Sequence, residues 1–238
     1  MNLTERQSEI LKRIVKEYID SAEPVSSKLL EKEHRFDVCP ATIRIEMQKL
    51  TDRGFIFQPH TSSGRVPTDK GYRFFVDSLF GEREEKLDGF EIDEWFDEEA
   101  EDTVKFIQSL TSKLASASQA LVLNHLKREK LFWKDGWEEI LKEPEFQEKK
   151  YIANFVDFLR NFEKNIDEFE GEAGVKIYIG KESPLPKSRD FSIISSKYFL
   201  PEEKEEGFLA IIGPKRMNYD RNVGIVNSLI KLLEDFLM

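Results

Sequence analysis

The sequence predicts an α+β fold divided between two domains. Apolar stripes at helical spacing alternate with short β-type runs along the 238 residues. The charge also changes along the chain. Residues 1–76 carry 13 Lys and Arg against 11 Asp and Glu, whereas residues 81–102 carry 12 acids and 2 bases. Such an acidic block is usually a solvated linker or helix surface and less often an interaction tail. We therefore predict domains over 1–80 and 103–238, joined by an acidic linker over 81–102.

The composition excludes several classes of protein. Hydrophobic residues make up 39% of the chain, with 19 Phe, which is enough to form a core, so we do not expect a disordered chain. No run of 18 apolar residues occurs, and residues 1–13 lack the apolar segment of a signal peptide. We therefore expect a cytoplasmic protein without a membrane partner. Cys39 is the single cysteine, so it cannot form an internal disulfide or, by itself, a thiolate zinc site.

Two helices are predicted at the start of the chain. Thr4 followed by Gln7 fits a capping box, in which the two side chains satisfy free backbone N–H groups. Ser26 or Ser27 is expected to cap a short second helix over residues 28–32, with a turn after it. The first helix has one apolar stripe, formed by Ile10, Leu11, Ile14, Val15, Tyr18 and Ile19.

A third helix is predicted from Pro40, which suits the first helical position, to a stop at Gly54. Ile43, Met47 and Leu50 share one face and are expected to be buried. The opposite face is polar and partly basic, as in a helix that reads DNA bases, although an ordinary surface helix would show the same pattern. That face carries Thr42, Arg44, Ile45, Gln48 and Lys49.

A two-stranded ribbon is predicted directly after the third helix. Residues 55–58 are typical of a strand, 59–64 of a turn and 65–67 of a return strand, and Thr68 is expected to cap a helix over 69–79. Three helices, a ribbon and a further helix are the order of a winged helix-turn-helix domain, which binds double-stranded DNA. The ribbon, or wing, offers donors to phosphate oxygens at His60, Thr61, Ser62, Ser63 and Arg65.

The predicted DNA contacts follow from the chemistry of each side chain. Lys28, Lys49 and Arg65 are expected to neutralise phosphates, and Gly64 to let Arg65 swing toward a minor groove. Major-groove contacts are assigned to Thr42, Arg44, Gln48 and Lys49. The full predicted set is Ser27, Lys28, Thr42, Arg44, Ile45, Gln48, Lys49, His60, Thr61, Ser62, Ser63 and Arg65.

The second half of the chain is predicted to mix helices with strands. The apolar stripe over 103–118 fits core packing or a dimer seam. The last helix, about 221–236, has two apolar lines, which we interpret as a surface for a second subunit, with deep burial as the alternative. Another helix is predicted over 151–169, and strands over 175–179, 191–195 and 208–212.

Enzyme chemistry has little support in the sequence. His34, His60 and His125 are expected in a turn, the wing and a loop, without the spacing of a metal site. Ser62 and Ser63 lack a base partner at a recognisable spacing, and no glycine pattern for nucleotide binding occurs. We therefore expect a protein that is not an enzyme and has no catalytic, metal or cofactor site.

Several runs resemble the HrcA family of heat-inducible transcription repressors. In the first domain they are AEPVSSK at 22–28, PATIR at 40–44 and the long run QPHTSSGRVPTDKGYR at 58–73. In the second half, Ile140–Leu141, Pro144–Phe146, Gly174–Val175 with Ile179–Gly180, and Ile212–Tyr219 resemble that family's effector domain. The acidic segment and residues near 125–132 have no clear counterpart.

The resemblance implies a repressor that binds, as a homodimer, an inverted-repeat operator upstream of chaperone operons. It also implies that the chaperonin GroEL keeps the repressor folded, so that active repressor falls when unfolded protein occupies the chaperonin. The alternative is a winged-helix protein–protein adaptor with little DNA affinity, which the acidic segment and Ile45 motivate. A gel-shift series on upstream DNA separates the two.

The chain departs from the family pattern in its third helix. Cys39 stands where the family usually has Ser, and a weak cap is expected to cost about 1 kcal/mol of helix stability. Ile45 stands where the family usually has Asn, a reader of base edges, whereas Ile makes only apolar contacts, for example to a thymine methyl. The operator is then expected to differ from the family's, unless Ile45 packs against the second helix.

The second departure is a deletion. Residues 119–123 resemble the first strand of the effector domain, and residues 131–136 follow almost at once. In the family, several strands and an inserted dimerisation domain lie between these points. The resemblance therefore implies a reduced GAF-like α+β domain over 103–238 and leaves the dimer geometry open.

Overall fold

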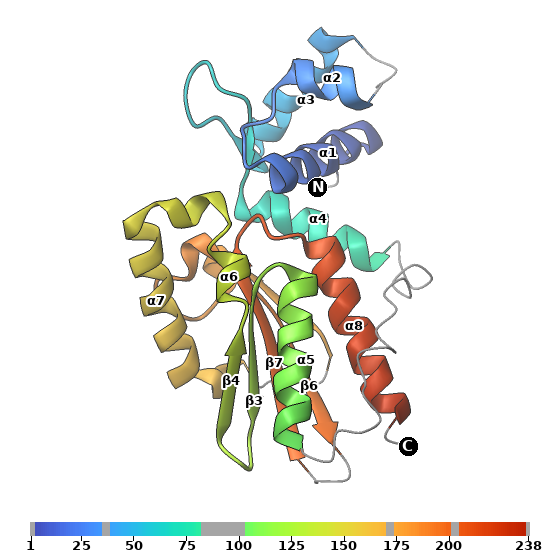
Figure 1. Ribbon diagram of the computed structural model, residues 1–238. Helices are drawn as coiled ribbons and strands as arrows, with labels where there is room; N and C mark the ends of the chain where they lie inside the picture. Colours follow the sequence, from blue (N-terminus) through green and yellow to red (C-terminus); the bar gives the residue numbers. More distant parts are fainter. Residues whose placement is uncertain (1–2, 35–38, 82–102, 170–173, 201–204, 237–238) are drawn as a thin grey trace. The chain divides into compact units, whose positions relative to one another are not determined.

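The computed structural model describes residues 3–34, 39–81, 103–169, 174–200 and 205–236 (Figure 1). The chain divides into two compact units, Met1–Glu82 and Arg83–Met238. Both units contain helices and strands, so the α+β class is confirmed. The predicted acidic linker, apart from Gly81, lies outside the described residues. No helix in the described ranges is long and apolar enough to span a membrane.

The first unit contains four helices and one two-stranded sheet in its described part, in the predicted order. The two strands are antiparallel, and Ile56 pairs with Pro67. The second helix is longer than predicted, so His34 lies at its end rather than in a turn. The elements are α1 (Glu5–Ser21), α2 (Ser27–His34), α3 (Pro40–Asp52), β1 (Ile56–Phe57), β2 (Val66–Pro67) and α4 (Asp69–Gly81).

Helix caps explain where α1 and α2 begin. Both hydrogen bonds of the predicted capping box between Thr4 and Gln7 are present at the start of α1. Of the two serines proposed to cap α2, Ser26 does so, because its hydroxyl accepts a hydrogen bond from the Leu29 N–H at 3.1 Å. The predicted apolar stripe of α1 is buried at all positions except Tyr18, which is half-buried, and so forms the centre of the unit's core.

The second unit is built on a five-stranded antiparallel sheet with the order β4-β3-β7-β6-β5. The last two strands are longer than predicted. His125 was expected in a loop, but it lies in β3 and is 7% exposed, with its ring stacked on Phe132 at 4.2 Å between centroids. The strands are β3 (Leu121–Leu126), β4 (Leu131–Asp135), β5 (Lys176–Ile179), β6 (Phe191–Leu200) and β7 (Glu205–Pro214).

Helices cover both faces of this sheet (Figure 1). One face packs against α7, and the other packs against α5 and α8, which also contact each other. The helix predicted over 151–169 ends at Lys164 and continues as a short 3-10 turn, η3 (Ile166–Glu168). The helices are α5 (Thr103–Ser118), α6 (Trp137–Ile140), α7 (Lys149–Lys164) and α8 (Tyr219–Phe236), and the other 3-10 turns are η2 (Pro144–Gln147), η4 (Gly180–Glu182) and η5 (Ser188–Asp190).

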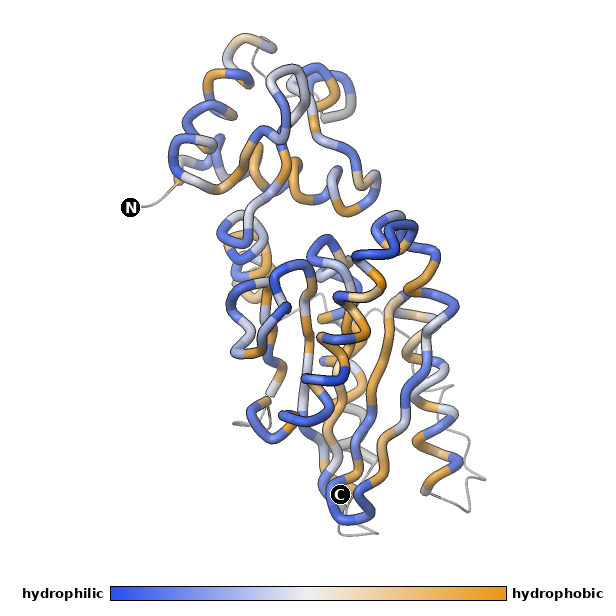
Figure 2. The backbone as a smooth tube through the Cα atoms, turned by 90° about the vertical axis from the view of Figure 1, so that its left-hand side faces the viewer, coloured by the Kyte–Doolittle hydropathy of each residue, from blue (hydrophilic) through white to orange (hydrophobic). Residues whose placement is uncertain are grey.

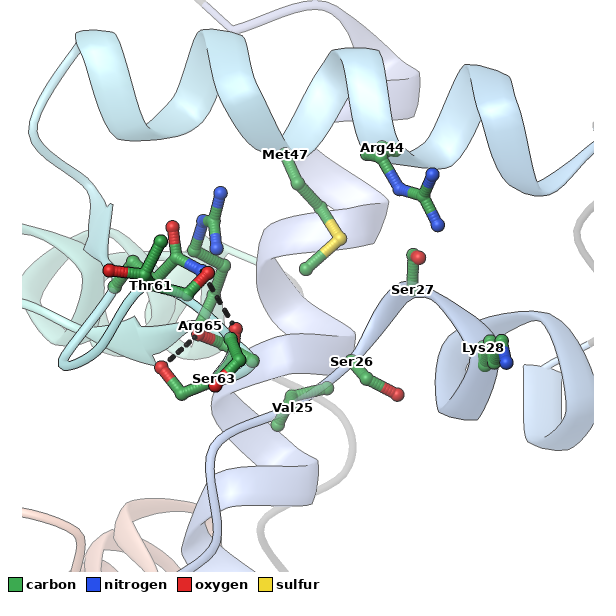
Figure 3. Close-up of a pocket in the computed structure, with 12 residues that line it drawn as sticks. Val25, Ser26, Ser27, Lys28, Arg44, Met47, Thr61, Ser63 and Arg65 are labelled. Carbon is green, nitrogen blue, oxygen red and sulfur yellow. Dashed lines mark hydrogen bonds between the residues drawn. The ribbon is translucent and has the colours of Figure 1, made fainter.

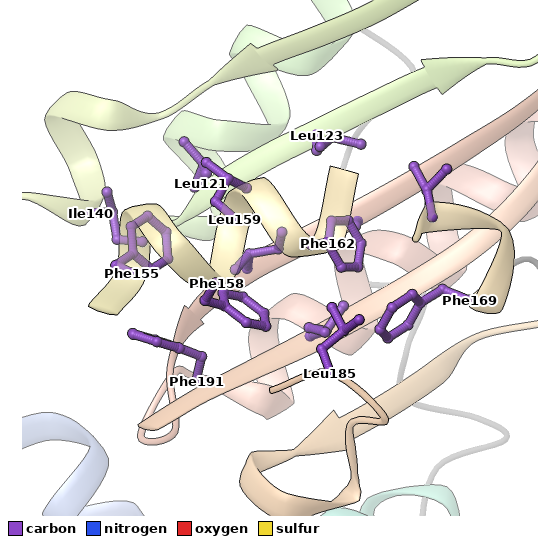
Figure 4. Close-up of a cluster of buried hydrophobic side chains, with 14 of the residues drawn as sticks. Leu121, Leu123, Ile140, Phe155, Phe158, Leu159, Phe162, Phe169, Leu185 and Phe191 are labelled. Atoms are coloured by element: carbon purple, nitrogen blue, oxygen red, sulfur yellow. The ribbon is translucent and has the colours of Figure 1, made fainter. Parts of the chain in front are cut away.

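Aromatic side chains fill the layer between α7 and the sheet (Figure 4). Phe155 and Phe158 of α7 both pack on Phe191 of β6, with ring centroids 5.2 and 5.0 Å apart. Phe162 lies 6.3 Å from Phe208 of β7. In Figure 2 the central strands of this unit are coloured as hydrophobic over much of their length. Burial of these rings contributes apolar stabilisation to the unit.

Two helices that were expected to offer partner surfaces are instead used inside the second unit. Ile107, Leu110 and Leu114 of α5 are at most 1% exposed, which favours the core-packing interpretation over a dimer seam. Both predicted apolar lines of α8 are buried as far as residue 229, including Ile225 and Leu229 at 0%. The deep-burial alternative is therefore favoured there, and the side chains beyond residue 230 lie outside the described part.

Candidate nucleic-acid interface

Helix α3 separates a buried face from an exposed one, as predicted. Ile43 and Leu50 are fully buried, and Met47 is 4% exposed. On the opposite face Arg44 is exposed, and so are Ile45, Gln48 and Lys49, whereas Thr42 is half-buried. Ile45 is 56% exposed, the highest fraction among the large apolar side chains of the described residues. The interpretation that Ile45 packs against α2 is therefore wrong.

The exposed α3 side chains differ in whether they have hydrogen-bond or ion-pair partners. The Gln48 amide donates to the Asp52 carboxylate at 2.8 Å, and Lys49 forms an ion pair with Glu46 at 2.8 Å. Arg44, by contrast, has no hydrogen-bond or ion-pair partner among the described residues. Of the predicted α3 cations, Arg44 is therefore the one that is not already neutralised by its own helix.

A buried polar network holds α3 against α1, and the sequence analysis missed it. The Gln7 amide donates to Glu46 at 2.8 Å and accepts from the Arg53 guanidinium at 3.0 Å. Hydrogen bonds from Lys49 and then Gln7 lower the pKa of the Glu46 carboxyl. Glu46 is 8% exposed despite its charge. The network therefore fixes the orientation in which α3 presents its outer face.

The start of α3 shows the effect of the cysteine there. Cys39 occupies the N-cap position, and its side chain makes no capping hydrogen bond, as expected of a weak cap. Its thiol lies 3.4 Å from the Thr42 hydroxyl. Hydrogen bonds from the Thr42 side chain and backbone lower the pKa of the exposed Cys39 thiol.

Side-chain hydrogen bonds hold the wing loop in one conformation. The Gln58 amide donates to the backbone carbonyls of Thr61 and Ser63, at 2.8 and 3.0 Å. The Ser63 hydroxyl donates to the carbonyl of His60 and accepts from its N–H, so it is not free to bind phosphate. The side chains of Thr61 and Ser62 remain exposed at the tip. Sequence reasoning did not identify Gln58, because an amide in a strand carries no distinctive spacing.

The swing of Arg65 toward a minor groove stays a prediction, and the structure shows how Arg65 is held within the first unit. The backbone of Arg65 exchanges two hydrogen bonds with Val25, at 2.9 and 2.8 Å, and so adds the segment between α1 and α2 to the wing as a bridge. The Arg65 guanidinium donates to the Thr51 hydroxyl at 3.2 Å. Gly64 is required for close packing rather than for freedom, because a Cβ there would lie 2.4 Å from the Pro24 carbonyl oxygen.

A hollow of about 400 Å³ brings most of the predicted DNA-binding residues together (Figure 3). It lies between the start of α2, the outer part of α3 and the wing. Four predicted α3 residues and His60 do not line it, namely Thr42, Ile45, Gln48, Lys49 and His60. The predicted residues that line it are Ser27, Lys28, Arg44, Thr61, Ser62, Ser63 and Arg65.

This arrangement suits the binding of an anionic group. Lys28 and Arg44 have no partner in the described part of the chain, and the first N–H groups of α2 lie at the same hollow. No group of three or more His, Cys, Asp and Glu side chains that could hold a metal ion occurs among the residues that the structure describes.

Comparisons with known proteins give the family. The heat-inducible transcription repressor HrcA of Thermodesulfovibrio yellowstonii is 29% identical, with 97% of each chain covered. That of Natranaerobius thermophilus is 28% identical, with 95% of this chain and 94% of the relative covered. The first alignment runs over 338 positions, so about a hundred positions have no residue in this 238-residue chain. Over a shorter stretch of 77 residues, 32% of this chain and 23% of the relative, the repressor of Streptomyces albus G is 56% identical.

A solved structure and a family model complete the comparison. A crystal structure of a hypothetical protein matches with a TM-score of 0.85 over 99% of each chain, at 23% identity, and so supports the fold alone. The family model "HrcA protein C terminal domain" matches residues 75–223, more than half of the chain. The chain therefore belongs to the HrcA family.

Proposed function

We propose that the protein is a sequence-specific transcription repressor of heat-shock operons, as the names of its relatives indicate. In this proposal the first unit is a winged helix-turn-helix domain. Its helix α3 enters the major groove, and the wing and the start of α2 contact the backbone. The observation that carries the proposal is the hollow at which Lys28 and Arg44, unpaired within the described ranges, meet the wing beside the exposed face of α3.

The proposed operator is an inverted repeat, and the proposed repressor is a homodimer. Two copies related by a two-fold axis would place their α3 helices in major-groove segments one or more helical turns apart. The second unit supports a reduced GAF-like effector domain, because a compact sheet is covered on both faces and the connection between β3 and β4 is only residues 127–130. We propose that this unit contributes to dimerisation without the family's inserted domain.

The proposed control is by protein stability in the cytoplasm. When the free energy of unfolding is only a few kcal/mol, heat can deplete the native state. A chaperonin such as GroEL that returns chains to the native state then restores repression. When unfolded proteins occupy the chaperonin, less repressor is refolded and chaperone genes are transcribed. This cycle needs no chemical reaction by the repressor itself.

Nuclease protection tests the proposal directly. Purified protein is titrated onto DNA from upstream of the chaperonin genes of its own organism and onto a scrambled duplex. We expect protection of an inverted repeat below micromolar protein and no protection of the scrambled duplex. Protection should weaken when Thr61 and Ser62 are both changed to Ala, but not with Ser112→Ala, an exposed position on α5. A protein without a specific footprint would instead favour the adaptor interpretation.

A further inference from the structure

The hollow between α2, α3 and the wing contains a hydroxyl that the fold does not use. Ser27 is 9% exposed and lines the hollow, yet its side chain has no hydrogen-bond partner among the described residues. The Ser27 hydroxyl is not one of the fully buried, unpaired side-chain atoms of the described residues, and it lies at the wall of the hollow. Capping of α2 does not need Ser27, since Ser26 already accepts from the Leu29 N–H. The hydroxyl is therefore available to a ligand that binds in the hollow.

The charges around Ser27 determine the kind of ligand. Lys28 and Arg44 line the same hollow, and neither has an ion-pair partner in the part of the chain that the structure describes. Figure 3 shows Ser27 on α2 and Arg44 on α3 turned into this space. Helix α2 begins at Ser27, so its partial positive charge adds to the two cations. None of the described residues that line the hollow is Asp or Glu. A single anionic group is the ligand that these donors fit.

We propose that this hollow binds one backbone phosphate of the DNA in each half-site, with Arg44 and Ser27 as its ligands and Lys28 at the edge. The inference rests on the proposed DNA-binding function and refines it. Arg44 then positions the protein on the duplex instead of reading a base, which differs from the role that the sequence predicts. Base reading is left to the α3 residues outside the hollow, Ile45 foremost.

Methylphosphonate substitution tests the proposal, because it removes the charge of one chosen phosphate. The operator found by nuclease protection is prepared with a single neutral linkage at each position in turn, and its affinity is measured for the full chain. We expect one position per half-site at which wild-type affinity falls about tenfold. At that position the neutral linkage should cause no further loss of affinity in Arg44→Ala. In Ser27→Ala the loss of affinity should be smaller than in the wild type.

Two further measurements separate a phosphate ligand from a base reader. Arg44→Ala should weaken binding to all operator variants by a similar factor and lower the salt slope by about one per subunit. Arg44→Lys should restore part of the affinity, because it keeps the charge. The matched control is Lys16→Ala, an exposed cation on α1 outside the hollow, which should keep the full sensitivity to the neutral linkage.

The outcomes are distinct for the two proposals. Two results with Arg44→Ala would overturn the phosphate site and leave the repressor proposal intact. In one, the variant changes the base preference at one position; in the other, it remains sensitive to every neutral linkage. A wild-type protein that binds no duplex specifically would overturn the repressor proposal, and the phosphate site with it. Circular dichroism of each variant shows whether its helices are retained.

Discussion

Ile45 is an apolar side chain on a helix face that is otherwise polar. At 56% exposure it is more exposed than any other large apolar side chain of the described residues. Its β-branched side chain is stiff at χ1, so it presents a fixed methyl surface. In a major groove the matching feature is the 5-methyl group of thymine, since Ile can neither donate nor accept a hydrogen bond. Ile45 is therefore the residue at which we expect the operator preference to be set.

Replacing single thymines by deoxyuridine removes that methyl group and nothing else. We expect one thymine per half-site whose replacement weakens wild-type binding, with little effect on Ile45→Ala. Ile45→Asn should shift the preference toward adenine, because Asn pairs with the N6 and N7 edge of adenine. Each mismatch should cost about 1–3 kcal/mol. Binding titrations on the substituted duplexes measure this, and equal affinities for all of them would contradict it.

Glu46 should make the first unit sensitive to acid. Its pKa is lowered in the folded chain by hydrogen bonds from Lys49 and Gln7, whereas in the unfolded chain it titrates near the ordinary value of about 4.3. The stabilisation is thus fully present above that value and is lost as the pH falls through the lower folded value. Glu46→Gln should cost about 1–3 kcal/mol near neutral pH and progressively less below about pH 4. Urea unfolding at several pH values measures the difference, and a constant difference would contradict it.

Single residues also show the limit of prediction from sequence. Periodicity was sufficient to identify Ile43 and Leu50 as buried, because burial repeats with the helix. It could not show that Lys49 is paired with Glu46 while Arg44 has no partner among the residues with described positions, because both are cations on the same helix face. Partners between side chains depend on rotamers and on neighbouring elements, which spacing does not encode.

The bridge between Val25 and Arg65 joins the wing to the segment that leads into α2. Gly64→Ala would place a methyl group against the backbone of Pro24 and Val25, at 2.4 to 2.5 Å. Because backbone cannot yield as a side chain does, we expect the wing to be displaced. The expected result is a loss of about 1–3 kcal/mol in stability together with weaker DNA binding.

The matched control for Gly64→Ala is Ser62→Gly, which alters the exposed wing tip without adding an atom. It should leave the unfolding midpoint nearly unchanged. Calorimetry gives the stabilities and gel shifts give the affinities. Equal midpoints for the two variants would show that the bridge tolerates the extra methyl group.

In the second unit, Arg216 joins two distant segments. Its guanidinium, 9% exposed, bonds to Glu145 at 2.7 and 2.9 Å and also to Glu143. These bonds tie the loop between β7 and α8 to η2, and they raise the pKa of Arg216 against the opposing effect of desolvation. Arg216→Ala leaves both carboxylates unpaired and should lower the unfolding free energy by about 3 kcal/mol. Urea denaturation measures this, and Lys142→Ala, at an exposed position, is the control.

The bounds and burial of helices and strands were predicted well where one face of the element is buried. They were predicted poorly where two faces are buried. The helix boundaries of α3 and α5 follow from a cap, a proline or a single apolar stripe. Strands β6 and β7 are each 10 residues long, whereas the predicted runs, 191–195 and 208–212, stop where polar or turn-type residues follow. Pairing between the two strands extends both past these runs, since Phe191 pairs with Pro214 and Leu200 with Glu205. Helix α8 looked like a partner surface because it packs against both β6 and α5, which requires a broad apolar surface.

The whole chain has a net charge of −10, which opposes its approach to DNA. In the proposed dimer, DNA binding would then depend on a few local contacts in each of two subunits. We expect the logarithm of the affinity to fall linearly with the logarithm of salt concentration, by about 0.9 for each neutralised phosphate. Gel shifts between about 50 and 200 mM salt measure the slope. Equally tight binding by a monomer at high salt would contradict the proposed mechanism.

The connector between α1 and α2 joins the two parts that are proposed to contact DNA, since Val25 is bonded to the wing and Ser26 caps α2. In the proposed complex we therefore expect both contacts to be lost together. Melting of this short connector would release the ribbon and the second helix together. A rise in temperature would then act on the repressor as a switch with two positions, and a gradual decline in affinity would not be seen.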